Sequence, residues 1–234
     1  MELGGQVVLV TGASRGFGFA AAEAMGRAGA QVVAVARTSG GLEELDDAIR
    51  PGGGAAVLVP LDITDDAGLA RMGAALHERF GRVDLWLHTA AYAPPMAPAP
   101  HVGEKELDLA LGVNVRAFQR LIRVVDPLLR LAATGRAAIA ADLPEMPTFL
   151  GLYGATKAAQ SALTRAWAAE SAQRLSVAEI LLPAMATALR ARFHPGEPRE
   201  TLTPPAEAAA RLLDRLDALS PGARLDLRAP ESGR

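Results

Sequence analysis

Short runs of β-branched residues alternate with longer alanine-rich segments along most of this chain. Parallel strands need a long crossover connection, usually a helix, so this alternation is typical of a parallel sheet covered by helices. We expect strands at Val7 to Val10, Gln31 to Ala36, Ala55 to Val59, Val83 to His88, Ala137 to Ala140 and Val177 to Leu182. We expect helices at Gly16 to Ala28, Leu42 to Ile49, Asp65 to Phe80, Glu104 to Leu131, Tyr153 to Ser171 and Pro204 to Leu219. The sequence therefore predicts the α/β class: a single-domain doubly wound parallel sheet, Rossmann-like, of about seven strands with helices on both faces.

The chain has 234 residues, half of them apolar, which is enough to bury one large core. We interpret residues 1–234 as one domain. The proline-rich stretch Pro94 to Pro100 can be a linker or a loop, and its position inside the strand and helix alternation favours a loop. The irregular segment Pro183 to Thr203 contains three prolines and is expected to form a mobile lid over a substrate.

Composition excludes several classes of function. The net charge is −2 and the basic residues are scattered, so we expect no nucleic-acid partner. The chain has no cysteine and its four histidines lack ligand-like spacing, so we expect no metal. No apolar stretch approaches the roughly 20 residues of a membrane span, and Met1 to Gln6 carries no leader pattern. We expect a soluble, cytoplasmic protein without a membrane partner.

A glycine-rich motif follows the first expected strand. It reads Thr11-Gly12-Ala13-Ser14-Arg15-Gly16-Phe17-Gly18, and a helical pattern starts within it. Glycines there allow a tight turn and let backbone amides approach a pyrophosphate at the positive end of the helix. The alternative is ordinary structural punctuation, but the strand before the motif and the helix after it favour dinucleotide binding.

The second expected strand ends in Ala36-Arg37-Thr38-Ser39. A carboxylate that would hold a ribose 2′-hydroxyl is absent from this position, and a guanidinium that would pair with a 2′-phosphate is present. Arg15 of the glycine motif can supply a second cation. The pattern favours NADP(H) over NAD(H), the alternative being two solvated surface arginines.

Tyr153 and Lys157 lie four residues apart. The chain has only two tyrosines, and only two of its 24 basic residues are lysines. A carbonyl that accepts hydride must also receive a proton at its oxygen, and a phenol with a reference pKa near ~10 does this poorly at neutral pH unless its anion is stabilised. An ammonium on the same helical face can lower the pKa of the phenol and reach ribose hydroxyls. The planar fork of an arginine has a different geometry, which is a reason for lysine to persist here.

These motifs, with Asp62-Ile63 after the third strand and Asn114 in the long helix, resemble the short-chain dehydrogenase/reductase family in order and approximate spacing over nearly the whole chain. The resemblance implies that Asp62 and Ile63 contact the adenine, that Ala90 and Ala91 line the cofactor, and that Asn114 holds a water in a proton relay. It implies NADP(H) contacts for Gly12, Ser14, Arg15, Gly16, Phe17, Gly18, Arg37, Tyr153 and Lys157, and catalytic roles for Tyr153, Lys157 and Asn114. It also suggests a homodimer or homotetramer formed through the long helices.

The chain departs from the family pattern near the substrate oxygen. The family has a serine about twelve to fourteen residues before the tyrosine, whereas this chain has Ile139-Ala140-Ala141 followed by Asp142. Loss of one preorganised donor typically costs about 10²- to 10³-fold in rate. Asp142 either replaces the serine, for example toward an imine, or caps a turn near Pro144.

Smaller departures also concern the loops around the cofactor. The family's paired asparagines appear as His88-Thr89, and the glycine after Pro183 appears as Ala184. We interpret His88 as a buried strand residue rather than a general base. Thr187 is a candidate for binding the nicotinamide carboxamide.

Three functions remain open from the sequence. The first is an NADPH-dependent oxidoreductase that reduces a small carbonyl or imine compound, or oxidises the corresponding alcohol. The second is a non-catalytic NADP(H)-binding protein, a sensor or assembly partner, to which the missing serine points. The third is a serine hydrolase, because Gly12-Ala13-Ser14-Arg15-Gly16 matches the nucleophile-elbow pattern, although that pattern belongs in the middle of a hydrolase sheet.

Overall fold

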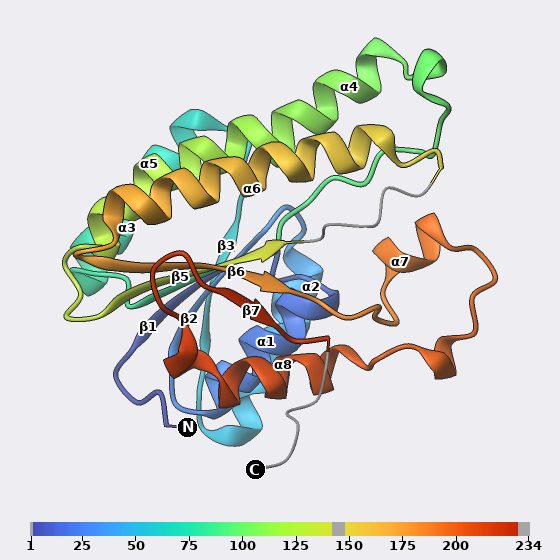
Figure 1. Ribbon diagram of the computed structural model, residues 1–234. Coiled ribbons are helices and arrows are strands. Elements are labelled where there is room, and N and C mark those ends of the chain that lie inside the picture. Colours follow the sequence, from blue (N-terminus) through green and yellow to red (C-terminus); the bar gives the residue numbers. More distant parts are fainter. Residues whose placement is uncertain (1, 142–147, 229–234) are drawn as a thin grey trace.

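A seven-stranded parallel sheet lies at the centre of the computed structural model, which describes residues 2–141 and 148–228 (Figure 1). The strand order is β3-β2-β1-β4-β5-β6-β7. The strands are β1 (Val7–Thr11), β2 (Gln31–Ala36), β3 (Ala56–Pro60), β4 (Leu85–His88), β5 (Gly135–Ala141), β6 (Leu175–Leu181) and β7 (Arg224–Asp226). The predicted α/β class, parallel sheet and strand number are confirmed.

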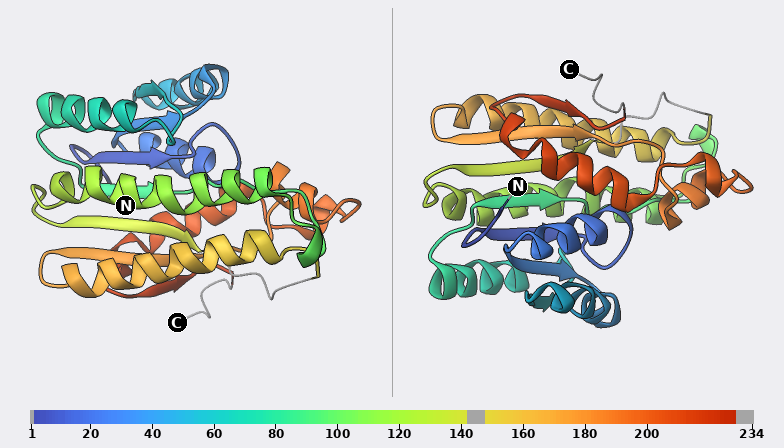
Figure 2. Two further views of the ribbon diagram at one scale, coloured as in Figure 1. Left: turned by 90° about the horizontal axis from the view of Figure 1, so that it is seen from above. Right: turned by 90° about the horizontal axis from the view of Figure 1, so that it is seen from below.

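Helices cover both faces of the sheet, as the views from above and below show (Figure 2). They are α1 (Gly16–Arg27), α2 (Ser39–Ile49), α3 (Asp66–Phe80), α4 (Glu104–Leu111), α5 (Phe118–Leu129), α6 (Gly151–Ser171), α7 (Ala188–Phe193) and α8 (Pro205–Asp214). Helices α1, α2 and α8 pack on one face, and α3, α5 and α6 pack on the other. The central strands are therefore enclosed on both sides.

Strand β1 shows how this enclosure follows from the sequence. All five of its residues are buried. Val8 and Val10 contribute to the core beneath α1, α2 and α8, whereas Val7 and Leu9 contribute to the core beneath α3, α5 and α6. A strand buried on both faces needs a continuous apolar run instead of an alternating one, as this strand has.

The chain changes direction across the sheet at β1. Strand β1 pairs with β2 on one side and with β4 on the other, so the connections after β1 and after β3 lead to opposite halves of the sheet. Loops that leave the carboxyl ends of β1 and β4 diverge there. The diverging loops leave a crevice between them, and a crevice at this position is the usual ligand site in open α/β sheets.

The helix that we predicted from Glu104 to Leu131 is interrupted by a π-helical segment and ends at Leu129. Helix α4 ends at Leu111, a π-helical segment occupies Gly112–Ala117, and α5 follows. Asn114 lies fully buried in the π-helical segment. A π turn shifts the hydrogen-bond register locally, and the side chain of Asn114 in this segment makes the tertiary contacts described below.

Two predictions near the carboxyl terminus also need correction. The segment Pro183 to Thr203 is not wholly irregular, because it contains α7 and a short 3₁₀ turn at Arg199–Thr201. The final helix, predicted from Pro204 to Leu219, ends at Asp214 and is followed by a 3₁₀ turn at Leu216–Ala218. The sequence had not located the seventh strand, β7, which has only three residues.

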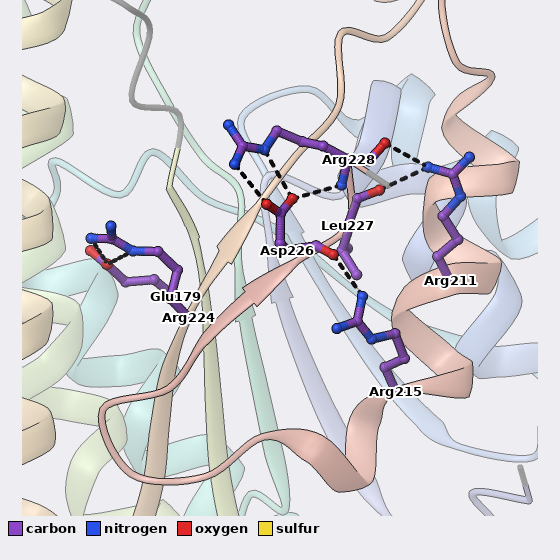
Figure 3. Close-up of polar contacts among 7 residues, drawn as sticks. All are labelled: Glu179, Arg211, Arg215, Arg224, Asp226, Leu227 and Arg228. Carbon is purple, nitrogen blue, oxygen red and sulfur yellow. Dashed lines mark hydrogen bonds and ion pairs between the residues drawn. The ribbon is translucent and has the colours of Figure 1, made fainter. Parts of the chain in front are cut away.

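A buried carboxylate ties β6 to β7. Glu179 of β6 is 4% exposed and accepts hydrogen bonds from the Ser161 hydroxyl and from Arg224 Nε and Nη2 of β7, at 3.0 and 2.8 Å from the guanidinium nitrogens (Figure 3). Charge-assisted bonds of this kind stabilise a carboxylate that burial would otherwise disfavour.

The residues after β7 are held by arginines of α8 and the turn that follows it (Figure 3). Arg215 donates to the Asp226 carbonyl at 2.6 Å, and Arg211 donates to the Leu227 carbonyl at 2.8 Å. Hydrogen bonds from Arg228 lower the pKa of Asp226 to about 2. These contacts pair the short edge strand with its own chain and leave charged side chains along the edge, which discourages pairing with other strands.

We expect Arg224→Met to lower the free energy of unfolding by about 1–3 kcal/mol, because Glu179 then stays buried without its cation. Glu179→Gln combined with Arg224→Met should cost less than Arg224→Met alone, since the uncompensated charge is gone. Urea unfolding followed by the fluorescence of the two buried tryptophans, Trp86 and Trp167, measures both values. Equal losses in the single and double variants would contradict a role for the charge.

Candidate active site

A cavity of about 1060 Å³ opens at the carboxyl edge of the sheet, between the loops that follow β1 to β6. Every residue that we predicted to contact a cofactor lies on its wall: Gly12, Ser14, Arg15, Gly16, Phe17, Gly18, Arg37, Asp62, Ile63, Ala90, Tyr153 and Lys157. The structure therefore brings the glycine motif, the strand-two arginine and the tyrosine–lysine pair around one space.

The glycine motif packs too closely against the end of β4 for larger residues. A Cβ on Gly12, whose φ is +92°, would lie 2.6 Å from the backbone nitrogen of Ala90, and one on Gly18 would lie 2.3 Å from the Gly12 carbonyl oxygen. Helix α1 starts at Gly16, and no side chain caps its first turn. Its first amides and its positive dipole end are therefore available to an anion in the cavity.

Three arginines with exposed side chains line the same cavity: Arg15, Arg37 and Arg192. Eleven other arginines form ion pairs with carboxylates, whereas none of these three does so within residues 2–141 and 148–228. Three cations without carboxylate partners around a concave space favour an anionic ligand. The sequence did not single out Arg192, because it belongs to the short helix α7.

Asp62 and Ile63 follow β3 at the far end of the cavity. Asp62 Oδ1 accepts hydrogen bonds from the backbone nitrogen and the hydroxyl of Thr64, at 2.9 and 2.7 Å, and thereby closes a turn. Ile63 is buried. This turn presents both residues to the space where the resemblance implies the adenine.

Tyr153 and Lys157 lie one turn apart near the start of α6, which begins at Gly151. Tyr153 is 2% exposed, and its ring packs against the ring of Phe193 in α7 at 4.9 Å between centroids. Lys157 is 4% exposed, and its Nζ donates to the Ala140 carbonyl at 2.8 Å and to Gln160 Oε1. The phenol and the ammonium are therefore held in a nearly dry environment, where electrostatic effects are strong.

The substrate-facing end of β5 carries alanine where the family has serine. Ala140 lines the cavity, and Ala141 follows it at the end of the strand. Neither residue has a side-chain donor for a substrate oxygen. Asp142, the candidate replacement, lies outside the described residues.

The side chain of Asn114 is fully buried and lies outside the cavity wall. Its Oδ1 accepts from the Tyr92 backbone nitrogen at 2.7 Å, and its Nδ2 donates to the Tyr92 carbonyl at 2.9 Å and to the Thr156 hydroxyl at 3.0 Å. Asn114 thus ties the loop after β4 to helix α6, next to Tyr153. The water that the resemblance implies at this residue stays a prediction.

His88 is 1% exposed, which confirms it as a buried strand residue. Its Nδ1 lies 2.7 Å from the Thr11 hydroxyl, and its Nε2 has no hydrogen-bond partner within the described residues. Burial, helped by the positive charge of Lys157, lowers the pKa of His88 to about 3. The imidazole is therefore neutral at neutral pH and adds no second cation beneath Lys157.

Gln160 is a polar residue of this site that the sequence reasoning missed. It is 1% exposed and lies one turn beyond Lys157 on the same face of α6. A signal was available, because Tyr153, Lys157, Gln160 and Thr164 follow the 4, 3, 4 spacing of one helical face, where an amide would be unusual in an ordinary core.

A family model described as short chain dehydrogenase matches residues 6–198. The chain belongs to the short-chain dehydrogenase family. This short-chain dehydrogenase is 31% identical to an L-fucose dehydrogenase of Oryctolagus cuniculus, over 72% of this chain and 58% of the relative. It is 32% identical to a sorbitol dehydrogenase of Cereibacter sphaeroides, over 70% of this chain and 64% of the relative. The chain thus spans about three fifths of the length of these curated relatives.

Solved structures match this short-chain dehydrogenase over almost its full length. A short chain dehydrogenase from Shigella flexneri complexed with NADP superposes with a TM-score of 0.91 at 26% identity, covering 96% of this chain and 98% of that one. A short chain dehydrogenase from Escherichia coli complexed with NADPH also gives 0.91 at 26% identity, covering 97% and 98%.

Ser14 of the nucleophile-elbow pattern lies on the cavity wall, whose described lining contains no histidine to act as its base. The Thr187 hydroxyl accepts from the Arg190 backbone nitrogen at 3.2 Å and so caps α7, while the residue also lines the cavity.

Within the described residues, no helix is long and apolar enough to cross a membrane, and no group of three or more candidate metal ligands occurs.

We expect His88 to make the stability of this short-chain dehydrogenase sensitive to acid. The unfolded chain binds a proton on this histidine near pH 6.5, whereas the folded chain resists it down to about pH 3, so stability is present above the unfolded pKa and is lost as the pH falls. Between about pH 7 and about pH 5 the loss should be about 2 kcal/mol. Urea unfolding at both pH values measures it.

His88→Leu should reduce that loss, and His101→Gln, which changes an exposed histidine, should leave it as in the parent. The same pH dependence in His88→Leu and the parent would contradict the assignment to His88.

Proposed function

We propose that this short-chain dehydrogenase is an NADPH-dependent oxidoreductase that transfers a hydride to a small carbonyl or imine compound, or catalyses the reverse alcohol oxidation. The observation that carries the proposal is that Tyr153 and Lys157 lie on the wall of the same cavity as the glycine motif and the arginines without carboxylate partners. A proton donor and an anion-binding turn in one crevice suit hydride transfer with a phosphorylated dinucleotide.

The residues around the cavity fit NADP(H). The amides at the start of α1 would bind the pyrophosphate, and Arg37 with Arg15 would pair with the 2′-phosphate. Arg192 would reach the phosphates from the α7 side. The complexes of related proteins with NADP and NADPH support this choice of cofactor. When bound, NADPH supplies the hydride for the carbonyl carbon.

Tyr153 would donate the proton that the substrate oxygen receives. The buried ammonium of Lys157 favours the phenolate that remains, because a positive charge nearby in a low-dielectric site stabilises an anion. The chain's other tyrosine is less suited to this role. Tyr92 donates a hydrogen bond to Glu106, and this bond raises the pKa of the Tyr92 phenol.

Apolar side chains pack around Tyr153 at the cavity wall, where Ala93 and Leu189 line the cavity. Leu150, Tyr153 and Phe193 form a small buried cluster, and Ala93 and Leu189 pack against it. Because α7 supplies two of these side chains, a movement of the proposed lid from Pro183 to Thr203 would change the access of a substrate to the phenol. An apolar ketone, aldehyde or imine fits this lining better than a charged compound.

A non-catalytic NADP(H)-binding protein is the second candidate, because Ala140 offers no hydroxyl to the substrate oxygen. The predicted homodimer or homotetramer also stays a proposal. Exposed leucines on α4, Leu107 and Leu111 among them, give such an assembly an apolar helical surface.

We expect wild-type protein to consume NADPH with members of a panel of ketones, aldehydes, quinones and imines, and Tyr153→Phe to lower kcat about 10²- to 10⁴-fold through loss of the proton donor. Tyr92→Phe is the matched control and should lose less than about tenfold, since its phenol is not the donor. Ala140→Ser should raise kcat, because it adds a donor near the substrate oxygen. NADPH absorbance measures all four proteins.

Tight NADPH binding without turnover in the wild type, especially if Ala140→Ser creates turnover, would favour the non-catalytic candidate. Neither binding nor turnover would overturn both.

We expect Arg37→Ser to weaken NADPH binding about 10- to 100-fold and to change NADH binding little, because a charge-assisted bond contributes about 1.5–3 kcal/mol. Arg123→Ser removes an exposed arginine of α5 outside the cavity lining and should leave both affinities unchanged. Titration calorimetry with both cofactors measures the ratio. Equal weakening for NADPH and NADH would argue against a 2′-phosphate contact.

A further inference from the structure

Gln160 lies on the same face of α6 as the tyrosine–lysine pair and contacts Lys157. It projects from α6 one turn after Lys157, and its side chain is almost fully buried. A buried amide is costly unless its donors and acceptor find partners. Its partners therefore indicate why an amide occupies this position.

Gln160 bridges the ammonium of Lys157 and the backbone of the π-helical segment. Lys157 Nζ donates to Gln160 Oε1, and Gln160 Nε2 lies 3.4 Å from the Asn114 carbonyl oxygen, in the direction of a donated hydrogen bond. Chemistry fixes the orientation of the amide. An ammonium has only donors and a carbonyl has only acceptors, so the flipped amide would face both neighbours with the wrong group.

The bridge restricts where the ammonium lies. Lys157 Nζ also donates to the Ala140 carbonyl near the end of β5, at 2.8 Å. One acceptor comes from the sheet and the other from α6, so the two directions hold the end of a flexible side chain in one position. A lysine side chain loses considerable rotamer freedom when it is fixed in this way, and two acceptors offset that cost.

Tyr153 and His88 are among the titratable groups near Lys157. Tyr153 lies one turn before it on α6, and His88 on β4 interacts with it electrostatically and stays neutral. Gln160 itself is neutral. The amide therefore binds the ammonium without offsetting its positive charge, which a carboxylate at this position would do.

We propose that Gln160 is a positioning residue that holds the ammonium of Lys157 on the face of α6 that carries Tyr153, without placing a negative charge next to it. The proposal rests on the proposed function of Tyr153 and Lys157. An amide exchanges no proton at neutral pH, so the bridge from Lys157 to the Asn114 carbonyl conducts none.

A spectroscopic titration tests the proposal without turnover. The chain has only two tyrosines, so Tyr92→Phe leaves Tyr153 as the single phenol, and its ionisation appears in the ultraviolet absorbance of the phenolate. In this background Gln160→Glu should raise the midpoint of the titration by about one pH unit or more, because the new carboxylate offsets the ammonium. Circular dichroism at each pH verifies that the protein stays folded.

Thr164→Val is the matched control. Thr164 is buried on the same face of α6, one turn beyond Gln160, and its hydroxyl donates to the Gln160 carbonyl. Thr164→Val should leave the midpoint of the Tyr153 titration unchanged. An unchanged midpoint in Gln160→Glu, or an equal shift in Thr164→Val, would overturn the proposal.

Kinetics give a second readout if the wild type turns over a carbonyl compound. Gln160→Leu is similar in volume but lacks the amide. It should lower kcat about tenfold or more and change KM less, because it slows proton donation by Tyr153 without removing a contact to the substrate. Gln160→Glu should recover part of kcat, with its pH profile moved to higher pH, since the carboxylate still accepts from Lys157. Identical profiles in Gln160→Leu and Thr164→Val would reduce Gln160 to a packing role.

Failure of this proposal differs from failure of the proposed function. A wild type that binds NADPH without turnover would contradict the proposed oxidoreductase activity. The phenolate titration would still decide whether Gln160 affects the ionisation of Tyr153 through Lys157.

Discussion

The parallel direction of the seven strands is the constraint on which the rest of the structure depends. Each strand is followed by a loop at the same edge of the sheet, and both faces are covered by helices, so polar groups that act on a ligand are concentrated at that edge. The reversal of direction at β1 opens the crevice there. The glycine motif, the arginines and the tyrosine–lysine pair come from distant parts of the sequence and meet because their strands all end at this edge.

A second constraint is the burial of an ammonium. Lys157 lies in a site with almost no solvent, and a charge in such a site needs acceptors. The carbonyl of Ala140 and the amide of Gln160 supply them, and His88 remains neutral close by. If Tyr153 donates the proton, as we propose, the ammonium held by these contacts would stabilise the phenolate that remains.

The sequence predicted the sheet and most of the candidate site because both depend on local patterns. A turn that needs glycine, an apolar run that needs two covered faces and a tyrosine one turn from a lysine are each visible in a few consecutive residues. The missed elements depend on distant contacts. Asn114 sits in a π turn where its side chain bonds to Tyr92 and Thr156, although the helical pattern runs unbroken through it. Helix α7 has six residues, too few to show a period, so Arg192 and Phe193 were not assigned to the site.

The sequence by itself determined the fold class, the order of the motifs and the family, because backbone conformation and burial period are encoded locally. Only the tertiary structure decided which further side chains join the candidate site: Gln160 bonded to Lys157, Phe193 against Tyr153, and Arg192 on the wall of the same cavity as the glycine motif. Their spacing along the chain carries no sign of these contacts. The contacts arise because separate crossovers of one parallel sheet return to the same edge, and that convergence exists only in three dimensions.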